Sequence, residues 1–367
     1  MNMTAAQRGV SPDGQIRVLV VDDSPSMRLL LQQMINREQD MRVVGTAPDP
    51  HAARELIKQL RPDLITLDVE MPGMNGLEFL DRLMRLHPMP VLMISSLTAE
   101  GSEQSLRALE LGAVDIIRKR ALTPKSEFLA MAAEVADKIR AAYQAVPHFR
   151  RRAPLRQVSA RPLVHAGARF DRRKVVVVGA STGGTEAIKD FLEVMPPGCP
   201  PILLTQHMPE DFTFRFAKRL NDCCAIRVKE AEAGERLQPG WAYIAPGHSH
   251  MLVRRVTGGG YETVLSQGPE VNLHRPAVDV LFDSAAEAVG RHAVGVLLTG
   301  MGKDGAAGLL RLRESGATTF TQDEASCVVF GMPRAARELG ASCAEGPPAR
   351  LADLALAALR DRPEEVS

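Results

Sequence analysis

The segment KVVVVGASTGG, residues 174–184, decides the fold of the C-terminal part of the chain. Four consecutive valines predict a strand that is buried on both faces, as in a parallel sheet, and a helical pattern follows the glycines. The glycine-rich stretch between them therefore predicts a tight strand-to-helix turn. Ser181 lies in this turn, where the first amides of the following helix have no partner inside that helix.

Further strand-like runs continue this pattern towards the C-terminus. PILLTQH (201–207), AVGVLLTGMG (293–302) and ATTFTQ (317–322) alternate with helical stretches and predict a Rossmann-like, mostly parallel α/β sheet. Shorter runs joined by glycine-containing turns lie between them and predict a short antiparallel excursion. These runs are AIRVKEA (225–231), GWAYIAPG (240–247), SHMLVRRV (249–256) and YETVLSQ (261–267).

The N-terminal part shows the same alternation, from Ile16 to about Ala142. Its β-branched runs are separated by amphipathic stretches, which predicts a five-stranded parallel sheet covered by helices on both faces. In such a sheet, ligands gather at the carboxyl ends of the strands. The runs are IRVLVV (16–21), MRVVGTA (41–47), DLITLD (63–68), PVLMIS (90–95) and AVDII (113–117).

Residues 144–171 separate the two patterns. They contain three prolines and many arginines but a single acid, Asp171, and they have no sustained apolar period, so they predict a linker. The predicted organisation is a disordered tail over 1–15, a first domain over 16–143, this linker, and a second domain over 172–362. A basic linker is usually only solvated, although it can also lie against an acidic surface.

Composition indicates an ordinary soluble protein and excludes several classes. The 45 basic and 44 acidic residues leave a net charge of +1, which gives no global attraction for nucleic acid. The five cysteines form no CxxC pair, so neither a zinc site nor a disulfide framework is favoured. An apolar signal-peptide core and a run of membrane-spanning length are both missing from the sequence, so we expect a cytoplasmic protein without membrane insertion.

Carboxylates follow two of the N-terminal strands. Asp22 and Asp23 come after IRVLVV, and Asp68 closes DLITLD, so these acids should meet at one sheet edge. Oxygen ligands partly exposed to water suit Mg²⁺, and Asp68 can then accept a phosphoryl group whose charge the metal and a lysine neutralise. Taken singly, each acid is more often a helix cap or the start of a turn.

The motifs VDDS (21–24), LDVEMPGMNG (67–76), ISS (94–96) and IRK (117–119) together resemble the response-regulator receiver family. The resemblance covers roughly the first third of the chain and implies a flavodoxin-like receiver domain. It implies the following roles: phosphoacceptor Asp68; Mg²⁺ ligands Asp22, Asp23, Asp68 and the main-chain carbonyl of Glu70; switch hydroxyl Ser95; and phosphate-binding Lys119.

Two positions depart from the receiver pattern. Arg120 follows Lys119 where the family usually has a proline, often after a cis peptide bond, and that bond costs about 2.5 to 4 kcal/mol before any other residue. The sequence therefore does not decide the conformation of the loop at Lys119 and Arg120. Ile116 occupies the position where many receivers have an aromatic switch residue, so we expect switching without ring rotation.

A serine nucleophile needs a base and an acid that orients the base. His207 closes the strand after Ser181, and Asp304 lies in the glycine-rich loop after AVGVLLTG, so all three should meet at one sheet edge. In these roles Ser181 attacks an acyl carbon, His207 transfers the proton, and Asp304 stabilises the imidazolium. Other histidines compete as the base, notably His248, His250 and His274.

Two other enzyme classes share the glycine-rich turn. A turn of this kind more often holds a nucleotide phosphate, and VVVVGASTGG is similar to the start of short-chain dehydrogenases. Those NAD(P) enzymes need Tyr-x-x-x-Lys, but the residues four positions after Tyr143, Tyr243 and Tyr261 are not lysines. An α/β-hydrolase has the order nucleophile, acid, histidine, whereas these candidates run serine, histidine, acid.

The second half closely resembles the chemotaxis protein-glutamate methylesterase family, often called CheB. The resemblance spans the predicted second domain, and its fusion to a receiver repeats the family's architecture. It implies the triad Ser181, His207 and Asp304, with Thr182 and the Met301 amide assisting at the oxyanion or substrate cleft. The motifs are GASTGGTEAI (179–188), TQHMP (205–209), APG (245–247), HRPAVDVLF (274–282), LTGMGKDGAAGL (298–309) and QDEASCVVFGMP (322–333).

The same resemblance implies a function. It implies hydrolysis of glutamate methyl esters on the cytoplasmic helices of chemoreceptors, with deamidation of specific glutamines, and a chemotaxis-type histidine kinase as phosphodonor. We expect the unphosphorylated receiver to cover the Ser181 cleft and phosphate on Asp68 to favour an open arrangement. The alternative is a response regulator whose output domain only binds DNA or a protein, and no helix-turn-helix pattern supports it.

Overall fold

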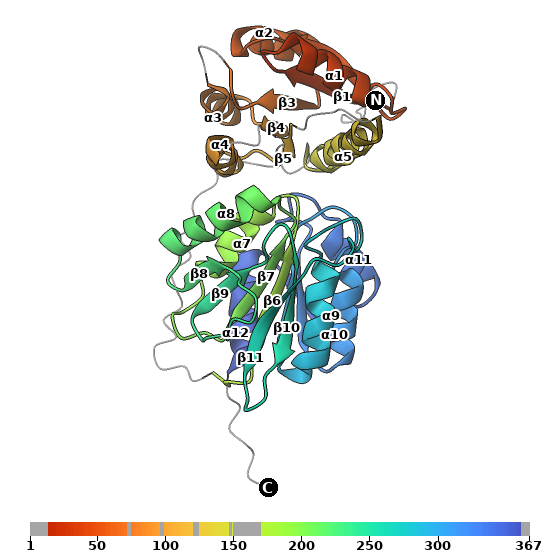
Figure 1. The fold of residues 1–367 in the computed structure, drawn as a ribbon. Helices are drawn as coiled ribbons and strands as arrows, with labels where there is room; N and C mark the ends of the chain where they lie inside the picture. The colour runs from red at the N-terminus through yellow and green to blue at the C-terminus, as the bar shows by residue number, and fades with distance from the viewer. Residues whose placement is uncertain are drawn as a thin grey trace, which may run out of the picture. The chain divides into compact units, whose positions relative to one another are not determined.

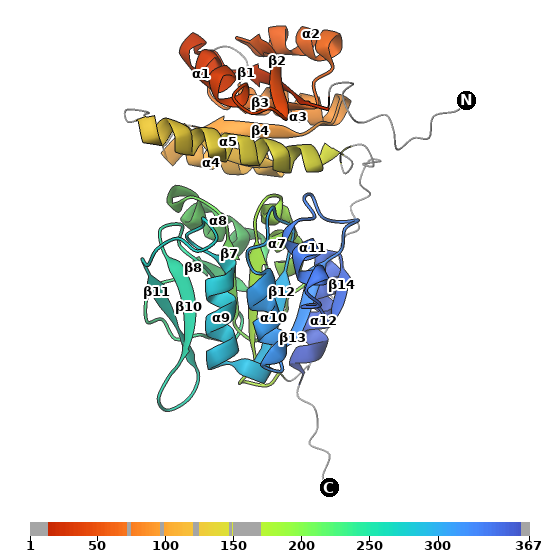
Figure 2. The same cartoon turned by 90° about the vertical axis from the view of Figure 1, so that its right-hand side faces the viewer.

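In this computed structural model the described residues are 14–71, 75–95, 99–119, 125–146, 149 and 170–360. Contacts between residues divide the chain into two compact units, Met1–Ala153 and Pro154–Ser367, each of which is described by itself (Figures 1 and 2). Most of the predicted tail and most of the predicted linker lie outside the described residues. Arg120, on which the prediction for the lysine loop depended, lies outside them as well.

Within its described part, the N-terminal unit has a sheet of five parallel strands in the order β2-β1-β3-β4-β5. Because β1 lies between β2 and β3, the strand order reverses there, which creates a crevice at the carboxyl ends of β1 and β3. The strands are β1 (Ile16–Val21), β2 (Met41–Ala47), β3 (Leu64–Asp68), β4 (Val91–Ser95) and β5 (Asp115–Arg118).

Helices cover both faces of this sheet, with α1 beside α5 and α3 beside α4 (Figure 1). Two of the helices start at sequence signals for a helix N-terminus, because the side chains of Ser24 and Asp49 accept backbone amides of the first turn and proline follows each. The helices are α1 (Pro25–Ile35), α2 (Pro50–Leu60), α3 (Gly76–Leu86), α4 (Ala99–Glu110) and α5 (Lys125–Gln144).

The C-terminal unit is built on seven parallel strands, counted over residues 170–360, in the order β14-β13-β12-β6-β7-β9-β8. Its strands are β6 (Val175–Ala180), β7 (Ile202–Gln206), β8 (Arg227–Glu230), β9 (Trp241–Ile244), β12 (Ala293–Leu297), β13 (Thr318–Gln322) and β14 (Ala344–Gly346). All residues of β6 are buried, as the run of valines predicts. The predicted α/β class of both halves is therefore confirmed.

One part of the strand prediction was wrong. Within residues 170–360, only β10 (His250–Arg255) and β11 (Tyr261–Ser266) form an antiparallel pair of strands. Strands β8 and β9 join the parallel sheet instead, because residues 231–240 return the chain to the starting end of the sheet before β9 begins. The glycine-containing turns therefore predicted correctly where these strands end. They did not predict whether β8 and β9 run parallel or antiparallel to their neighbours.

Helices also lie on both faces of the larger sheet, with α7 and α8 on one side and α9 and α10 on the other (Figure 1). The helices are α7 (Gly184–Leu192), α8 (Glu210–Cys223), α9 (Val278–Ala288), α10 (Ala306–Glu314), α11 (Met332–Glu338) and α12 (Pro348–Leu359), with a 3₁₀ turn at Gly290–His292. None of the helices in the described ranges is long and apolar enough to cross a membrane.

Candidate active site and acidic cluster

Three polar side chains meet at the carboxyl edge of the larger sheet. Ser181 follows the central strand β6, His207 follows its neighbour β7, and Asp304 lies in the loop after β12, the neighbour on the other side. His207 Nδ1 lies 3.1 Å from Ser181 Oγ, and His207 Nε2 lies 2.8 Å from Asp304 Oδ2. The structure thus brings together all three residues that were predicted to form a triad.

The two ring nitrogens of His207 have different roles. An ionised carboxylate only accepts hydrogen bonds, so Nε2 carries the proton that is donated to Asp304. In the neutral ring Nδ1 is then unprotonated and faces the Ser181 hydroxyl, as a general base must. This is the reverse of the chymotrypsin arrangement, in which Nε2 faces the serine.

Asp304 is held as a carboxylate although its side chain is only 2% exposed. Burial alone would raise its pKa, but hydrogen bonds from His207, the Val278 amide and Asn272, together with the charge of His207, lower the pKa to about 2. Val278 and Asp279 supply amides from the first turn of α9, where the helix dipole also favours negative charge. Asp304 is therefore ionised at neutral pH and keeps its hydrogen bond to His207.

The Ser181 turn is fixed by backbone contacts. The Ser181 amide donates to the Thr299 carbonyl at 3.0 Å, and the Gly184 amide donates to the Ser181 carbonyl at 2.7 Å. Gly183 has a φ of 77° and its missing side chain leaves room for Val328, so a Cβ at this position would lie 2.5 Å from the Val328 Cβ. Glycine is therefore required for the turn that presents Ser181 at the start of α7.

The N-terminal unit has a second polar cluster, at the carboxyl ends of β1 and β3. Carboxylate oxygens of Asp22, Asp23 and Asp68 lie within 4.8 Å of one another. Asp22 and Asp68 are buried, and Lys119 Nζ lies 2.7 Å from Asp68 Oδ2 and 3.2 Å from Asp22 Oδ2. The structure therefore brings together the predicted phosphoacceptor, two of its predicted metal ligands and the predicted lysine.

The acidic cluster carries more negative charge than Lys119 balances. Burial and the charge of Asp22 raise the pKa of Asp68 to about 6, although the hydrogen bond from Lys119 lowers it. Asp22 Oδ2 is buried and lies 3.2 Å from Lys119 Nζ, the same ammonium group that pairs with Asp68 Oδ2, so one cation serves two carboxylates. This oxygen-rich donor set with an excess of negative charge fits a hard divalent cation such as Mg²⁺.

The remaining predicted residues of this cluster lie close by. The Glu70 amide donates to Asp68 Oδ1 at 3.3 Å, and buried Ser95 at the end of β4 accepts the Lys119 amide through its carbonyl at 2.7 Å. Ile116 is a buried residue of β5. The roles of the Glu70 carbonyl, the Ser95 hydroxyl and Ile116 in switching remain predictions.

Comparisons with known proteins match both halves. Residues 176–355 match the family model described as CheB methylesterase, and residues 18–131 match the response regulator receiver domain. A protein from Thiobacillus denitrificans, named protein-glutamate methylesterase/protein-glutamine glutaminase, is 57% identical over 331 residues, covering 89% of this chain and 92% of its own. A similarly named protein from Dechloromonas aromatica is 59% identical over 331 residues, covering 89% and 93%.

This chain belongs to the CheB methylesterase family. The crystal structure of the Thermotoga maritima CheB methylesterase catalytic domain is also similar, with 38% identity and a TM-score of 0.49, covering 50% of this chain and 97% of that one. Membership in the CheB family confirms the resemblance drawn from the motifs, including the fusion of a receiver domain to a methylesterase domain.

Thr182 and Met301, which the CheB resemblance implies as helpers, both lie beside Ser181. The Thr182 carbonyl accepts the Thr299 hydroxyl at 3.0 Å, which fixes the backbone directly after Ser181. Met301 follows Gly300, where an added Cβ would lie 2.8 Å from the Ser181 Cβ. Their positions suit a role beside the acyl group, and the role itself remains a prediction.

The competing histidines are separated by their contacts. The His250 ring contacts the Pro269 carbonyl at 3.0 Å and accepts the Ala277 amide at 3.2 Å, so it has a structural role. His248 lies 3.4 Å from Glu210 on the partly exposed surface. His274 is different, because its ring stacks on the His207 ring with 3.7 Å between the ring centroids.

Sequence reasoning missed the residues that surround the CheB-family triad. Gln206 donates to the Ser181 and His207 carbonyls at 2.9 and 3.2 Å. Asn272 donates to both Asp279 and Asp304, at 2.7 and 2.8 Å. The motif HRPAVDVLF (274–282) was the available signal for this region, but it assigned no role to Asp279 and begins after Asn272.

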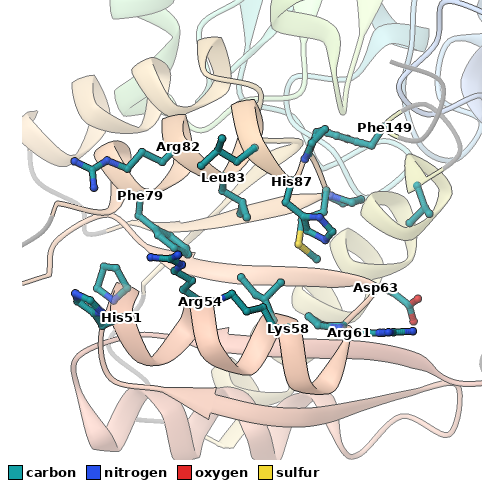
Figure 3. Close-up of a pocket in the computed structure, with 18 residues that line it drawn as sticks. His51, Arg54, Lys58, Arg61, Asp63, Phe79, Arg82, Leu83, His87 and Phe149 are labelled. Carbon is teal, nitrogen blue, oxygen red and sulfur yellow. The ribbon is translucent and has the colours of Figure 1, made fainter. Parts of the chain in front are cut away.

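A cavity of about 820 Å³ lies in the N-terminal unit between α2 and α3, and none of its lining residues belongs to either polar cluster (Figure 3). Phe79, Leu83 and Phe149 are among its apolar lining residues, and Lys58 and Arg82 line it as well. Both of these cations form ion pairs with glutamates of their own helices. Two of the four lysine and arginine side chains that line the cavity are therefore paired locally.

Proposed function

We propose that this chain is a phosphorylation-activated esterase that hydrolyses glutamate γ-methyl esters on the cytoplasmic helices of chemoreceptors and releases methanol. The observation that carries the proposal is the hydrogen-bonded chain from Ser181 through His207 to Asp304, with distances of 3.1 and 2.8 Å. Membership in the CheB family supports the substrate class, because the relatives are named protein-glutamate methylesterases.

The first half of the reaction acylates Ser181. Its Oγ attacks the ester carbonyl carbon while the hydroxyl proton moves to His207 Nδ1, and Asp304 stabilises the resulting imidazolium through Nε2. The tetrahedral intermediate then collapses, the bond from carbon to the methoxy oxygen breaks, and Nδ1 returns the proton to that oxygen. Methanol leaves, and the glutamyl group remains bound to Ser181 as an ester.

The second half uses water as the nucleophile. His207 Nδ1 takes a proton from water, the oxygen attacks the acyl carbon, and the proton returns to Ser181 Oγ as the glutamate carboxylate leaves. The same cycle deamidates a glutamine side chain when ammonia leaves in place of methanol. Deamidation is supported by the relatives, whose names include protein-glutamine glutaminase.

The developing oxyanion needs donors beside Ser181. The Ser181 amide already bonds to the Thr299 carbonyl, so other groups must serve. We assign Thr182 and the Met301 amide to this part of the cleft, because both positions adjoin Ser181 in space. Donors aimed at this oxygen stabilise the transition state more than the ester, which is how such a site accelerates the reaction.

The N-terminal unit supplies the switch. Asp68 accepts the phosphoryl group from a chemotaxis-type histidine kinase, Lys119 pairs with the phosphate, and Ser95 is the responding hydroxyl. Asp22, Asp23, Asp68 and the Glu70 carbonyl would hold a Mg²⁺ ion, which would supply the charge that neutralises the incoming phosphoryl group. The clustered carboxylates and the Lys119 ion pairs support this assignment.

The remaining features of the proposal follow from the substrate. Methylated receptor helices and the kinase are reached in the cytoplasm, and neither nucleic acid nor membrane insertion takes part.

We assign the receiver to residues 16–143, the linker to 144–171 and the esterase to 172–362. The matches over 18–131 and 176–355 support these limits.

Methanol release from methylated receptor tests the proposal. The native chain should release methanol in the presence of a phosphodonor, and Ser181→Ala should lower kcat by a factor on the order of 10⁶. Ser315→Ala is a matched control, because the hydroxyl of this serine donates to the Leu312 carbonyl at the end of α10. Equal rates for the native and Ser181→Ala proteins would exclude the esterase mechanism and favour a binding output domain.

A further inference from the structure

The turn Val271–His274 lies directly beside the triad and has an unusual backbone. Val271 and His274 exchange backbone hydrogen bonds of 3.1 and 3.0 Å, and the two residues between them have positive φ angles, 53° for Asn272 and 67° for Leu273. Asparagine tolerates this left-handed conformation, whereas leucine rarely adopts it. Leu273 is 84% exposed, so burial of its side chain does not compensate for the strain.

The residues on either side of Leu273 contact two members of the triad. The Asn272 side-chain amide donates to Asp304 Oδ1 at 2.8 Å and to Asp279 Oδ2 at 2.7 Å. The His274 ring stacks on the His207 ring with centroids 3.7 Å apart and an angle of 20° between the planes. A strained backbone is retained where the surrounding structure holds it, and here it directs both side chains at the triad.

We propose that His274 is a positioning residue for His207, and that the Val271–His274 turn holds the base and its acid partner together. This inference rests on the proposed function, in which His207 is the general base. Edge hydrogen bonds to Ser181 and Asp304 leave the His207 ring free to tilt about the line that joins its two partners. A ring stacked on one face prevents that tilt and keeps Nδ1 directed at the Ser181 hydroxyl.

The stack also acts on the charge that forms during the reaction. His207 becomes an imidazolium when it takes the Ser181 proton. An aromatic face whose centroid lies 3.7 Å away stabilises this positively charged ring more than it stabilises the neutral ring. The contribution of His274 is therefore larger in the transition state than in the ester complex. An interaction of this kind changes kcat, whereas KM stays the same.

Asn272 completes the arrangement at the acid. Asp279 and Asp304 are two buried carboxylates, and burial together with the charge of Asp304 raises the pKa of Asp279. The Asn272 amide donates one hydrogen to each of them, which joins the carboxylates without adding charge. The same turn that steadies the His207 ring thus fixes the carboxylate that the ring must meet.

Substitution of His274 separates stacking from a general effect on the fold. His274→Ala removes the stacked ring, so kcat for methanol release should fall about tenfold while KM stays within about twofold of the native value. His274→Phe keeps an aromatic face without a ring nitrogen, so its kcat should return to within about threefold of native. His248→Ala is the matched control and should have the native kcat, because this histidine faces Glu210.

A spectroscopic measurement supplies an independent readout. The proton between His207 Nε2 and Asp304 should give a low-field NMR resonance, which should be sharp in the native and His274→Phe proteins and broadened in His274→Ala. A native kcat in His274→Ala would overturn the inference. A His274→Phe protein that melts like the native chain but is as slow as His274→Ala would overturn it as well.

Failure of this inference is distinguishable from failure of the proposed function. If methanol release by the native chain does not depend on Ser181, the proposed function itself is wrong. If release depends on Ser181 but is indifferent to the ring at position 274, only the positioning role is wrong. Should His274→Ala melt at a lower temperature than the native chain, the kcat of His274→Phe decides the question.

Discussion

Asp304 shows how single residues set the chemistry of the site. Each of its carboxylate oxygens accepts two hydrogen bonds within the described structure. Oδ2 accepts from His207 and the Val278 amide, and Oδ1 accepts from Asn272 and the Asp279 amide. A carboxylate with its lone pairs occupied in this way has little freedom to rotate. The proton on His207 Nε2 is therefore fixed, and Nδ1 is left as the base.

Replacing Asp304 with asparagine tests this reasoning. The asparagine oxygen and nitrogen cannot both satisfy the present donors, and an NH₂ group facing His207 would favour the wrong tautomer. We expect kcat for methanol release to fall by a factor on the order of 10³ to 10⁴, with little change in KM. Asp283→Asn, on the exposed side of α9 next to Arg311, should keep the native rate.

The same carboxylate predicts how stability depends on pH. Folding lowers the pKa of Asp304 from its ordinary value of 3.8 to about 2, so its contribution is fully present above pH 3.8 and is lost as pH falls towards 2. The difference in unfolding free energy between the native and Asp304→Asn proteins should shrink by about 2 kcal/mol over that range. A difference that stays constant down to the lowest pH at which the protein folds would contradict this.

Urea unfolding followed by tryptophan fluorescence suits this measurement. Trp241 is the single tryptophan of the sequence and lies in β9, so its fluorescence reports on the C-terminal unit alone. The urea transitions of both proteins would be compared in steps from neutral pH downwards.

The three candidate residues of the triad could be predicted from sequence because each lies after the carboxyl end of a strand of the parallel sheet. Ser181 and His207 come immediately after β6 and β7, and Asp304 comes in the glycine-rich loop after β12. Asn272 and His274 follow no strand of that sheet, and a turn of two left-handed residues without glycine has no clear sequence signal. From the sequence, His274 could be considered only as an alternative base. Its stacking on His207 could not be predicted, because it depends on how segments distant in the sequence pack together.

At the scale of elements, the site depends on close approaches between strand ends and helix starts. Gly183 caps α7 in a left-handed conformation, and Gly179 leaves room for Val278 at the start of α9. An added Cβ at Gly179 would lie 2.2 Å from Val278 Cγ1, so the helix that supplies amides to Asp304 could not begin where it does. These glycines explain why the valine run ends in glycine-rich sequence.

Gly183→Ala tests the requirement for this turn. The φ of 77° and the contact with Val328 predict a loss of about 1 to 3 kcal/mol in unfolding free energy, together with a lower kcat. Gly198→Ala is the control, because nothing lies within 4 Å of a Cβ at that position. Equal stabilities for the two variants, measured by Trp241 fluorescence in urea, would show that the turn tolerates a side chain.

Elements were predictable in kind but not always in direction. The alternation of strands and helices followed from β-branched runs and amphipathic stretches, and the parallel sheets followed from that alternation. The direction of β8 and β9 did not follow, because short strands separated by glycine look alike in hairpins and in parallel crossovers. The path of residues 231–240, which the pattern does not encode, decides it.

For the molecule as a whole, the acidic cluster should respond to metal independently of the esterase. Mg²⁺ should raise the melting temperature of the N-terminal unit, with about 2.7 kcal/mol of stabilisation when its concentration is one hundred times the dissociation constant. Calorimetry measures this transition, and Trp241 fluorescence should report an unchanged C-terminal unit. Asp22→Asn should weaken the response, and an equal response to NaCl of matched ionic strength would exclude a specific site.

The central claim is that phosphorylation at Asp68 controls hydrolysis at Ser181 within one chain. It is tested most directly by the rate of methanol release from methylated receptor before and after addition of a phosphodonor, in the native and Asp68→Asn proteins. We predict about tenfold or greater acceleration of the native chain and none of Asp68→Asn, whose basal rate remains dependent on Ser181. Equal acceleration of both proteins would contradict the account.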